Sequence, residues 1–181
     1  FKIEGFAFLP VTSFSVALTT FTSQNLGAKQ YDRVKKGTAF GLVSGVALAE
    51  LIGIVFVIFA PSLIAMFNSS PEVVAFGAMQ ARTEALFYCV LSLSHRMAGI
   101  IRGAGKTMVP MLIMLICWCV IRVAYITITV HFIPDIRVVF WGYPITWMLS
   151  SVCFTLYYFK GDWMHNFERL DARRNAAANR N

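Results

Sequence analysis

The first 37 residues join a long apolar segment to a strongly basic one. The apolar segment runs from Phe6 to Gln24, carries small and hydroxyl residues on one side, and ends in Gln24-Asn25-Leu26-Gly27-Ala28. It is long enough to cross a bilayer, since a spanning helix needs about 20 residues. Four basic residues follow it: Lys29, Arg33, Lys35 and Lys36. Because short loops rich in Lys and Arg stay in the cytoplasm, this stretch predicts a polytopic membrane protein and the direction of one crossing.

The composition agrees with a membrane protein. Hydrophobic residues make up 57% of the chain and charged residues 14%, where a soluble domain has about 25% charged residues. The net charge is +7, and the basic residues responsible for it lie between apolar segments and in the tail. We therefore expect the lipid bilayer as a partner and no nucleic acid. The four cysteines form no C-x-x-C pair, and we expect neither a metal nor a cofactor. The chain does not begin with Met, and we expect a piece of a longer protein.

The apolar runs between helix breakers predict an all-α protein with five transmembrane helices. The spans are expected at about 5–27, 38–62, 75–101, 108–132 and 137–159. The breakers between them are Gly27 to Gly37, Asn68-Ser69-Ser70-Pro71, Gly103-Ala104-Gly105 and Pro134-Asp135, all rich in residues that end helices or form turns. Residues 1–160 are then the transmembrane part, and residues 161–181 a basic tail.

The distribution of basic residues predicts the topology. Eleven of them follow the first, third and fifth spans: Lys29, Arg33, Lys35, Lys36, Arg102, Lys106, Lys160, Arg169, Arg173, Arg174 and Arg180. Lys2 and Arg137 fall on the other side. This bias predicts a multi-pass protein of the cell membrane, the inner membrane in a bacterium, with the tail in the cytoplasm. In the tail, Trp163, Phe167 and Leu170 recur at i, i+4 and i+7, which suits a short helix on the membrane surface; a solvated tail is the alternative.

Two blocks of sequence resemble a known transporter family. The first block contains Pro10, Ser15-Val16-Ala17-Leu18-Thr19, Gln24-Asn25-Leu26-Gly27-Ala28, Tyr31-Asp32-Arg33 and Lys36-Gly37. The second block is Ile101-Arg102-Gly103-Ala104-Gly105-Lys106-Thr107, with Pro110 after it. The first is similar to the eighth helix and following loop of MATE (multidrug and toxic compound extrusion) transporters, and the second to their junction between helices ten and eleven. The resemblance covers the chain up to about residue 160.

The resemblance implies a twelve-helix transporter built from two six-helix lobes. This chain would hold helices eight to twelve, most of the C-terminal lobe, and the missing N-terminal lobe of the same protein would be its partner. Such transporters export amphipathic organic cations and other drugs in exchange for inward sodium or protons, as the lobes rock around a midplane site. The family's acid on helix ten would fall near Leu91, where no carboxylate stands, so we expect the principal coupling site to lie outside this chain or to differ.

Polar residues inside the third span are the main candidates for a functional site, because a charge at a membrane centre costs about 2.5 to 3.5 kcal/mol on insertion scales. Glu84, Tyr88, Ser92 and His95 lie at i, i+4, i+8 and i+11, on one helical face. We expect them to line a cavity where Glu84 binds a cation or proton and Tyr88 stacks on a planar cation. The alternative places Glu84 near the outer surface, paired with an arginine of a neighbouring helix.

Two further charges lie near the middle of spans. Glu50 is in the second span and Arg122 in the fourth, and we expect them to pair inside the bundle; an ion or proton role is the alternative. Arg96, near the end of the third span, is expected to reach toward the cytoplasmic headgroups.

The remaining polar candidates have structural readings beside functional ones. On the first span a polar face recurs at i, i+3, i+7 and i+11, and it suits close helix packing or a wet cavity equally: Thr12, Ser15, Thr19 and Ser23. At the two breakers we expect turn formation, capping or anchoring rather than substrate contact: Gln24, Asn25, Gly27, Arg102, Gly103 and Gly105. Gly27 and Gly37 are expected to bracket a tight turn, with positive φ available at such glycines.

These features bear on four classes of function. An antiporter that exports drugs or metabolites fits the two blocks and the spans. A flippase for lipid-linked saccharides, from the same wider superfamily, would need a more cationic cavity, for which Arg96 and Arg122 are candidates. A membrane enzyme would need paired catalytic groups, and no such motif is present. A structural subunit would leave the intramembrane charges without a role. We therefore predict the antiporter.

Overall fold

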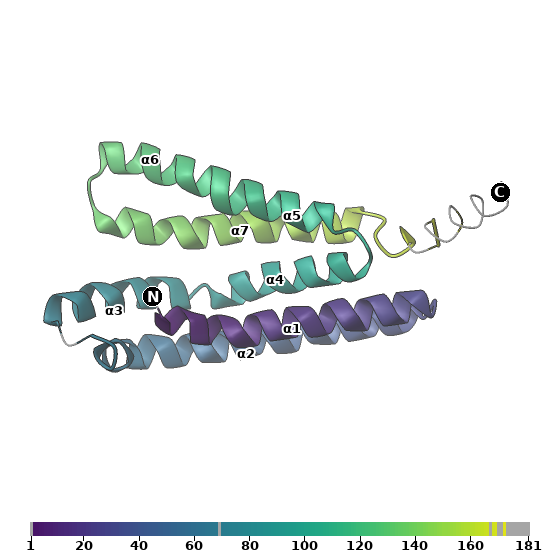
Figure 1. Cartoon of the computed structure of the whole chain (residues 1–181), viewed down its shortest axis with the longest axis horizontal. Helices are drawn as coiled ribbons and strands as arrows, with labels where there is room; N and C mark the ends of the chain where they lie inside the picture. The colour runs from purple at the N-terminus through teal and green to yellow at the C-terminus, as the bar shows by residue number, and fades with distance from the viewer. Residues whose placement is uncertain (1, 69, 167, 170–171, 173–181) are drawn as a thin grey trace.

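The computed structural model describes residues 2–68, 70–166, 168–169 and 172, and its regular elements are helices throughout. The elements in chain order are α1 (Lys2–Gly27), α2 (Tyr31–Ala65), α3 (Pro71–Ala85), α4 (Tyr88–Gly103), α5 (Met108–Met114), the π-helix η1 (Leu115–Ile121), α6 (Arg122–Phe132) and α7 (Ile136–Lys160). Figure 1 shows them as long rods running along one common direction. The predicted all-α class is confirmed.

The helices form three layers. In Figure 1, α1 and α2 make the lowest layer, α3 and α4 the middle one, and α5, η1, α6 and α7 the uppermost. Helix α4 is the centre of the bundle, since it packs against α1, α2 and α7 and also touches α5. Side chains of α4 therefore connect the outer layers.

Three helices among the described residues are long and apolar enough to cross a membrane: 31–65, 108–132 and 136–160. The last two agree with the predicted spans within one residue at each end. The first begins earlier than predicted, because α2 starts at Tyr31 and takes in Arg33, Lys35 and Lys36 as its first turns. The predicted loop up to Gly37 was wrong; a Cβ at Gly37 would overlap the Phe21 ring of α1, so this glycine serves helix packing. The count of five spans stays a prediction.

The third predicted span is broken into two helices. Helix α3 ends at Ala85 and α4 begins at Tyr88, with Leu86 and Phe87 in a turn between them. The amide of Phe87 donates to the Glu84 carbonyl, which tightens the end of α3. The predicted helix over 75–101 was wrong at this point, because neither Gly nor Pro marks the break.

Helices α1 and α4 are held together by small residues. A Cβ at Gly99 would lie 2.5 Å from the carbonyl oxygen of Ser15, and a Cβ at Gly103 would lie 2.5 Å from that of Thr19. The two hydroxyls complete the contact: Ser15 donates to the His95 carbonyl at 2.6 Å, and Thr19 donates to the Gly99 carbonyl at 2.9 Å. Gly99-x-x-x-Gly103 thus acts as a small-xxx-small contact between membrane helices.

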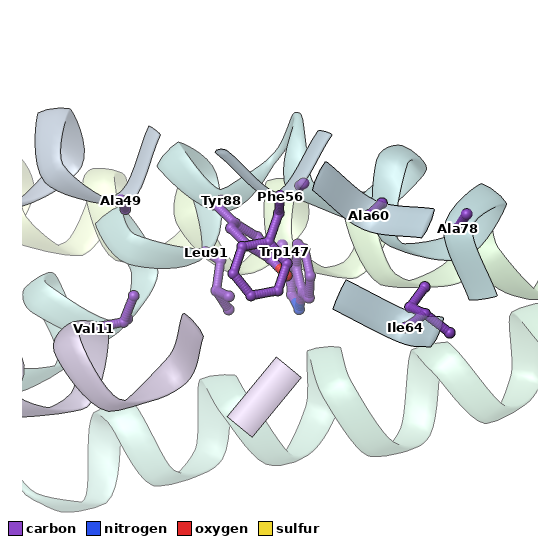
Figure 2. Packing of buried hydrophobic residues seen from close by; sticks show 10 residues of the cluster. Val11, Ala49, Phe56, Ala60, Ile64, Ala78, Tyr88, Leu91 and Trp147 are labelled. Atoms are coloured by element: carbon purple, nitrogen blue, oxygen red, sulfur yellow. The ribbon is translucent and has the colours of Figure 1, made fainter. Parts of the chain in front are cut away.

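The largest apolar core lies where α2, α3, α4 and α7 meet. Figure 2 shows Phe56, Tyr88 and Trp147 gathered at its centre. The ring centroids of Phe56 and Tyr88 are 6.1 Å apart and those of Tyr88 and Trp147 are 6.4 Å apart, within the range of favourable aromatic pairs. This core fixes Tyr88, one of the predicted cavity residues, within the packed interior.

The start of the tail folds back onto the bundle. Trp163 is 2% exposed and belongs to a core cluster with Leu26, Val34 and Ile100. Its indole donates to the Tyr158 carbonyl at 2.8 Å. The placement of Trp163 on a membrane surface, and its solvated alternative, were therefore wrong; Phe167 and Leu170 lie outside the described residues.

Polar contacts fasten the same segment. The Asn166 amide donates to the Ala104 carbonyl at the end of α4, and Arg169 pairs with Asp162. A hydrogen bond with His165 holds the pKa of Asp162 below its ordinary value. The Tyr31 hydroxyl donates a hydrogen bond to the Glu168 carboxylate. The tail thus joins the end of α7 to α4 and to the α1–α2 turn.

Candidate functional site

Arg122 is the centre of a polar cluster between α6 and α7. Its Nε and Nη2 donate to the Thr146 hydroxyl at 3.1 and 2.6 Å. Its guanidinium carbon lies 4.3 Å from the ring centroid of Tyr143 and 5.6 Å from that of Trp118. A cation over aromatic faces is stabilised by their quadrupoles, so the two rings and the Thr146 hydroxyl together stabilise the charge of Arg122.

The π-helix η1 places two members of this cluster. Trp118 lies within it and Arg122 follows at its end. A π-helix closes i to i+5 hydrogen bonds and shifts the angular positions of the residues around it, and such segments recur at functional sites. The Trp118 indole donates to the Ser150 hydroxyl at 3.1 Å, which ties its ring to α7.

His95 of α4 faces the Trp118 ring. Their ring centroids are 5.3 Å apart in an edge-on arrangement, and Phe8 of α1 stands at 5.9 Å on another side. The Nε2 of His95 is buried without a hydrogen-bond partner in the described part of the chain. His95 thereby connects the cluster on the upper layer to helix α1.

Glu84 is the penultimate residue of α3. Its side chain is 2% exposed, and its Oε1 accepts a hydrogen bond from Gln80 at 2.9 Å. The carboxylate acts electrostatically on Arg122. Arg122 is thus an arginine of a neighbouring helix that lies within electrostatic reach of Glu84, and Glu84 itself is buried within the bundle.

Three serines form a second polar group next to the cluster. The Ser94 hydroxyl lies 3.0 Å from that of Ser150 and 2.6 Å from that of Ser151. Ser151 also donates to the Val90 carbonyl. Because Ser150 accepts a hydrogen bond from Trp118, the serines connect α4 and α7 to the aromatic wall formed by Trp118 and Tyr143.

Of the predicted candidates, His95 and Arg122 both contact Trp118, and Glu84 acts electrostatically on Arg122. Tyr88 belongs to the apolar core instead, and two other candidates are separated from the cluster. Ser92 is fully buried on another side of α4, where it donates to the Gly45 carbonyl of α2 at 3.1 Å. Glu50 lies beside the Cys89 thiol, and its Oε2 is buried with no hydrogen-bond partner among the described residues. The predicted Glu50–Arg122 pair was wrong, because Arg122 faces α7 while Glu50 is on α2.

Arg96 also differs from its prediction. It is fully buried, with its guanidinium carbon 5.1 Å from the Phe14 ring centroid of α1. A Cβ at Gly45 would overlap the guanidinium. Arg96 therefore lies between α1, α2 and α4 and does not reach the headgroups.

The polar face of α1 is divided between packing and local bonds. Ser15 and Thr19 bind α4 as described above, whereas Thr12 donates to the Phe8 carbonyl and Ser23 to the Thr20 carbonyl of their own helix. Arg102 adds a bond from its Nη2 to the Ser15 hydroxyl at 3.1 Å. Packing is the role that the contacts of Ser15 and Thr19 support.

The two breaker motifs, at residues 24–27 and 102–105, lie where α1 and α4 end and make backbone contacts there. Asn25 donates to the Phe21 carbonyl at 2.7 Å, while Gln24 is exposed. Positive φ occurs at Lys29 (57°), not at Gly27, so the expected turn geometry of Gly27 was wrong. Gly105 has φ of 80°, which a glycine adopts at no steric cost, just after the end of α4 at Gly103.

The sequence pattern missed several members of the cluster. Trp118, Tyr143 and Thr146 were not singled out, nor were the three serines. A signal exists for Thr146: a buried arginine needs an acceptor, and the next helix is the first place to search for one. No group of three or more His, Cys, Asp or Glu that could hold a metal occurs in the described part of the chain.

The fold and the cluster define a polytopic helical membrane protein with a charged site between its layers. The chain belongs to the MatE family, since the family model matches residues 1–128. Among curated proteins it is 28% identical to the probable multidrug resistance protein NorM of Thermotoga maritima, over 62% of this chain and 24% of that protein. It is 25% identical to the probable multidrug resistance protein YpnP of Bacillus subtilis, over 90% of this chain and 36% of that protein.

These relatives agree with the transporter class predicted from the sequence. A third, the probable multidrug resistance protein YoeA of Bacillus subtilis, is 19% identical over 87% of this chain and 34% of its own length. The chain thus spans from a quarter to about a third of the curated relatives that it matches.

Proposed function

We propose that this chain is most of the C-terminal lobe, helices eight to twelve, of a multidrug antiporter driven by inward sodium or protons. The observation that carries the proposal is the buried Glu84 carboxylate within electrostatic reach of Arg122, beside a wall of aromatic rings. A cation bound at this carboxylate neutralises its charge, so the charge beside Arg122 differs between the occupied and the unoccupied site. The rings offer faces to planar cations.

The mechanism follows from competition at Glu84. A coupling cation or an organic cation that approaches the carboxylate replaces part of the attraction to Arg122. Arg122 remains bound to Thr146 and Tyr143 of α7. Cation binding at Glu84 therefore weakens the electrostatic attraction between α3 and α7. A ligand shifts a two-state equilibrium only through its different affinity for the two states, so this mechanism requires Glu84 to bind the cation with different affinity in the two lobe arrangements.

The flippase remains the alternative proposal, and it requires a cationic cavity. Arg96, one of the two arginines that suggested it, packs between three helices instead. The positive charge of the other arginine, Arg122, is offset by the negative charge of Glu84, so the two arginines do not make a cationic cavity. We therefore keep the antiporter, in a cell membrane with the tail in the cytoplasm and the N-terminal lobe as its partner.

The test is ethidium accumulation in a bacterium without its own pumps, with the complete protein expressed. We expect lower accumulation that depends on external sodium or is abolished by a protonophore, and the dependence names the ion. Glu84→Gln should remove at least most of this export at unchanged membrane expression. Glu72→Gln is the matched control, because Glu72 is exposed in the first turn of the same helix α3.

The outcomes separate the alternatives. Export that is unchanged in Glu84→Gln contradicts the role of Glu84. An absence of export with good expression contradicts drug export and favours the flippase, which lipid-linked saccharide transport in vesicles would then test.

A further inference from the structure

A wholly apolar groove runs along the outer face of α2 where it meets α4. It has a volume of about 440 Å³ and is lined by Leu42, Val43, Val46 and Ala47 of α2 and by Leu93 of α4. Val43 is 72% exposed, so the groove is open to the surroundings. Ligand sites of this size normally add a few polar groups that fix orientation, and this groove has none within it.

Two lysines continue the groove toward the start of α2. Lys35 lies seven and eleven residues before Leu42 and Val46, and Lys36 lies at the same distances before Val43 and Ala47. Residues at these spacings share a helix face, and seven residues of helix measure about 10 Å. Both lysines are exposed.

The depth of the groove identifies the medium around it. Helix α2 is long and apolar enough to cross a membrane. The groove lies inside its apolar part, where Phe40 and Leu51 of the same helix are also exposed. The lysines fall at the polar end of the same helix. An occupant therefore meets hydrocarbon at the groove and the headgroup region at the lysines.

We propose that this groove and the two lysines bind one anionic phospholipid, with an acyl chain in the groove and the phosphate at Lys35 and Lys36. A ligand must have an apolar tail and a negative head about 10 Å apart, which a phospholipid supplies. Clusters of basic residues at the end of a membrane helix attract anionic lipids. The bound lipid would contact α2 and α4 together.

The experiment measures lipid retention by native mass spectrometry. The protein is purified in neutral detergent and incubated with phosphatidylglycerol or phosphatidylcholine that carry the same acyl chains. We expect one tightly held phosphatidylglycerol and little phosphatidylcholine. The double variant Lys35→Gln, Lys36→Gln should lower retention of phosphatidylglycerol by roughly 30-fold, from what each lysine contributes near an anionic surface.

The matched control removes the same charge at the same end of the bundle. Lys29 lies in the α1–α2 turn. The Nη1 of Arg33 donates a hydrogen bond to the Oε1 of Gln30 at 3.4 Å. Lys29→Gln with Arg33→Gln should retain phosphatidylglycerol. An equal loss in both double variants, or equal retention of the two lipids by the unchanged protein, overturns the proposal.

A second variant tests the groove without altering charge. Val43→Trp fills it from an exposed position, so the core is undisturbed, and should expel phosphatidylglycerol at unchanged melting temperature. Full retention by Val43→Trp shows that the acyl chain lies elsewhere and overturns the site. The readout is lipid mass, so a failure here leaves the proposed antiport unaffected.

Discussion

The Nε of Arg82 donates a hydrogen bond of 3.2 Å to the Val57 carbonyl. Four residues after Val57, where its helical donor would stand, is Pro61, which has no backbone N–H. Arg82 of α3 therefore supplies the bond that Pro61 removes from α2. A charge-assisted hydrogen bond therefore fastens α3 to α2 at this point.

This relationship predicts a dependence between two substitutions. Arg82→Met should destabilise the protein by about 0.5–1.5 kcal/mol, because it leaves the Val57 carbonyl without a donor. Pro61→Ala restores the helical N–H, so Arg82→Met should cost clearly less in that background. Thermal unfolding in detergent of the two single variants and the double variant measures the coupling; costs that simply add would contradict it.

Gly45 and Arg96 give a second prediction. Gly45→Ala should destabilise by about 1–3 kcal/mol, since its methyl group overlaps the buried guanidinium and overpacking of this size is costly. Arg96→Met should be neutral or stabilising, because Nε and Nη1 of Arg96 are buried without hydrogen-bond partners in the described residues, and apolar replacement of buried charges is often tolerated. Chemical unfolding of both variants checks this. A large loss of stability in Arg96→Met would show that the charge has a partner.

The α1–α4 contact gives a third. Gly99→Ala should destabilise by about 1–3 kcal/mol, because the added Cβ meets the backbone of Ser15, which cannot move as a side chain can. Gly27→Ala is the matched control, as nothing lies within 4 Å of its Cβ position. Melting temperatures that fall equally in both variants would contradict the close packing.

Acid should loosen the tail. The pKa of Asp162 is lowered by its hydrogen bond with His165, and Arg169 lies on the same carboxylate. A lowered pKa in the folded state means that the full contribution is present above the ordinary Asp pKa of 3.8 and is lost as pH falls through the lower value. We expect constant protection of residues 162–166 against hydrogen exchange from pH 7 to 5, and loss below about pH 4. Asp162→Asn should remove the acid step; loss near neutral pH in the unchanged protein would contradict this assignment.

The long helices were predictable because strong local signals end them. Gly103 with Gly105, Pro134 with Asp135, and Lys160 mark ends that the structure has at 103, 132 and 160. The break at Leu86 and Phe87 and the π-helix at Leu115–Ile121 lack such signals, since their residues are ordinary for apolar helices. These features are set by packing between layers, as where the Gly53 position approaches the Ala85 carbonyl.

The candidate site was predictable only in part. Hydropathy identifies Glu84 and Arg122 as costly intramembrane charges, and both belong to the cluster. It cannot say which charge lies near which, because partners on different helices follow from helix rotation. Glu50 and Arg122 have similar depths in sequence but face different layers, whereas Thr146 reaches Arg122 across the α6–α7 hairpin.

The buried indole of Trp163 has a practical consequence for labelling this protein. Residues 161–166 are part of the folded bundle, with Trp163 and Asn166 both inside it. A fluorescent reporter that replaces the chain after Lys160 would remove the hydrogen bond from Asn166 to the end of α4 and expose the core cluster around Leu26. A reporter intended to leave the bundle intact has to follow residue 169, so that Glu168 can still bind Tyr31 and Arg169 can still bind Asp162.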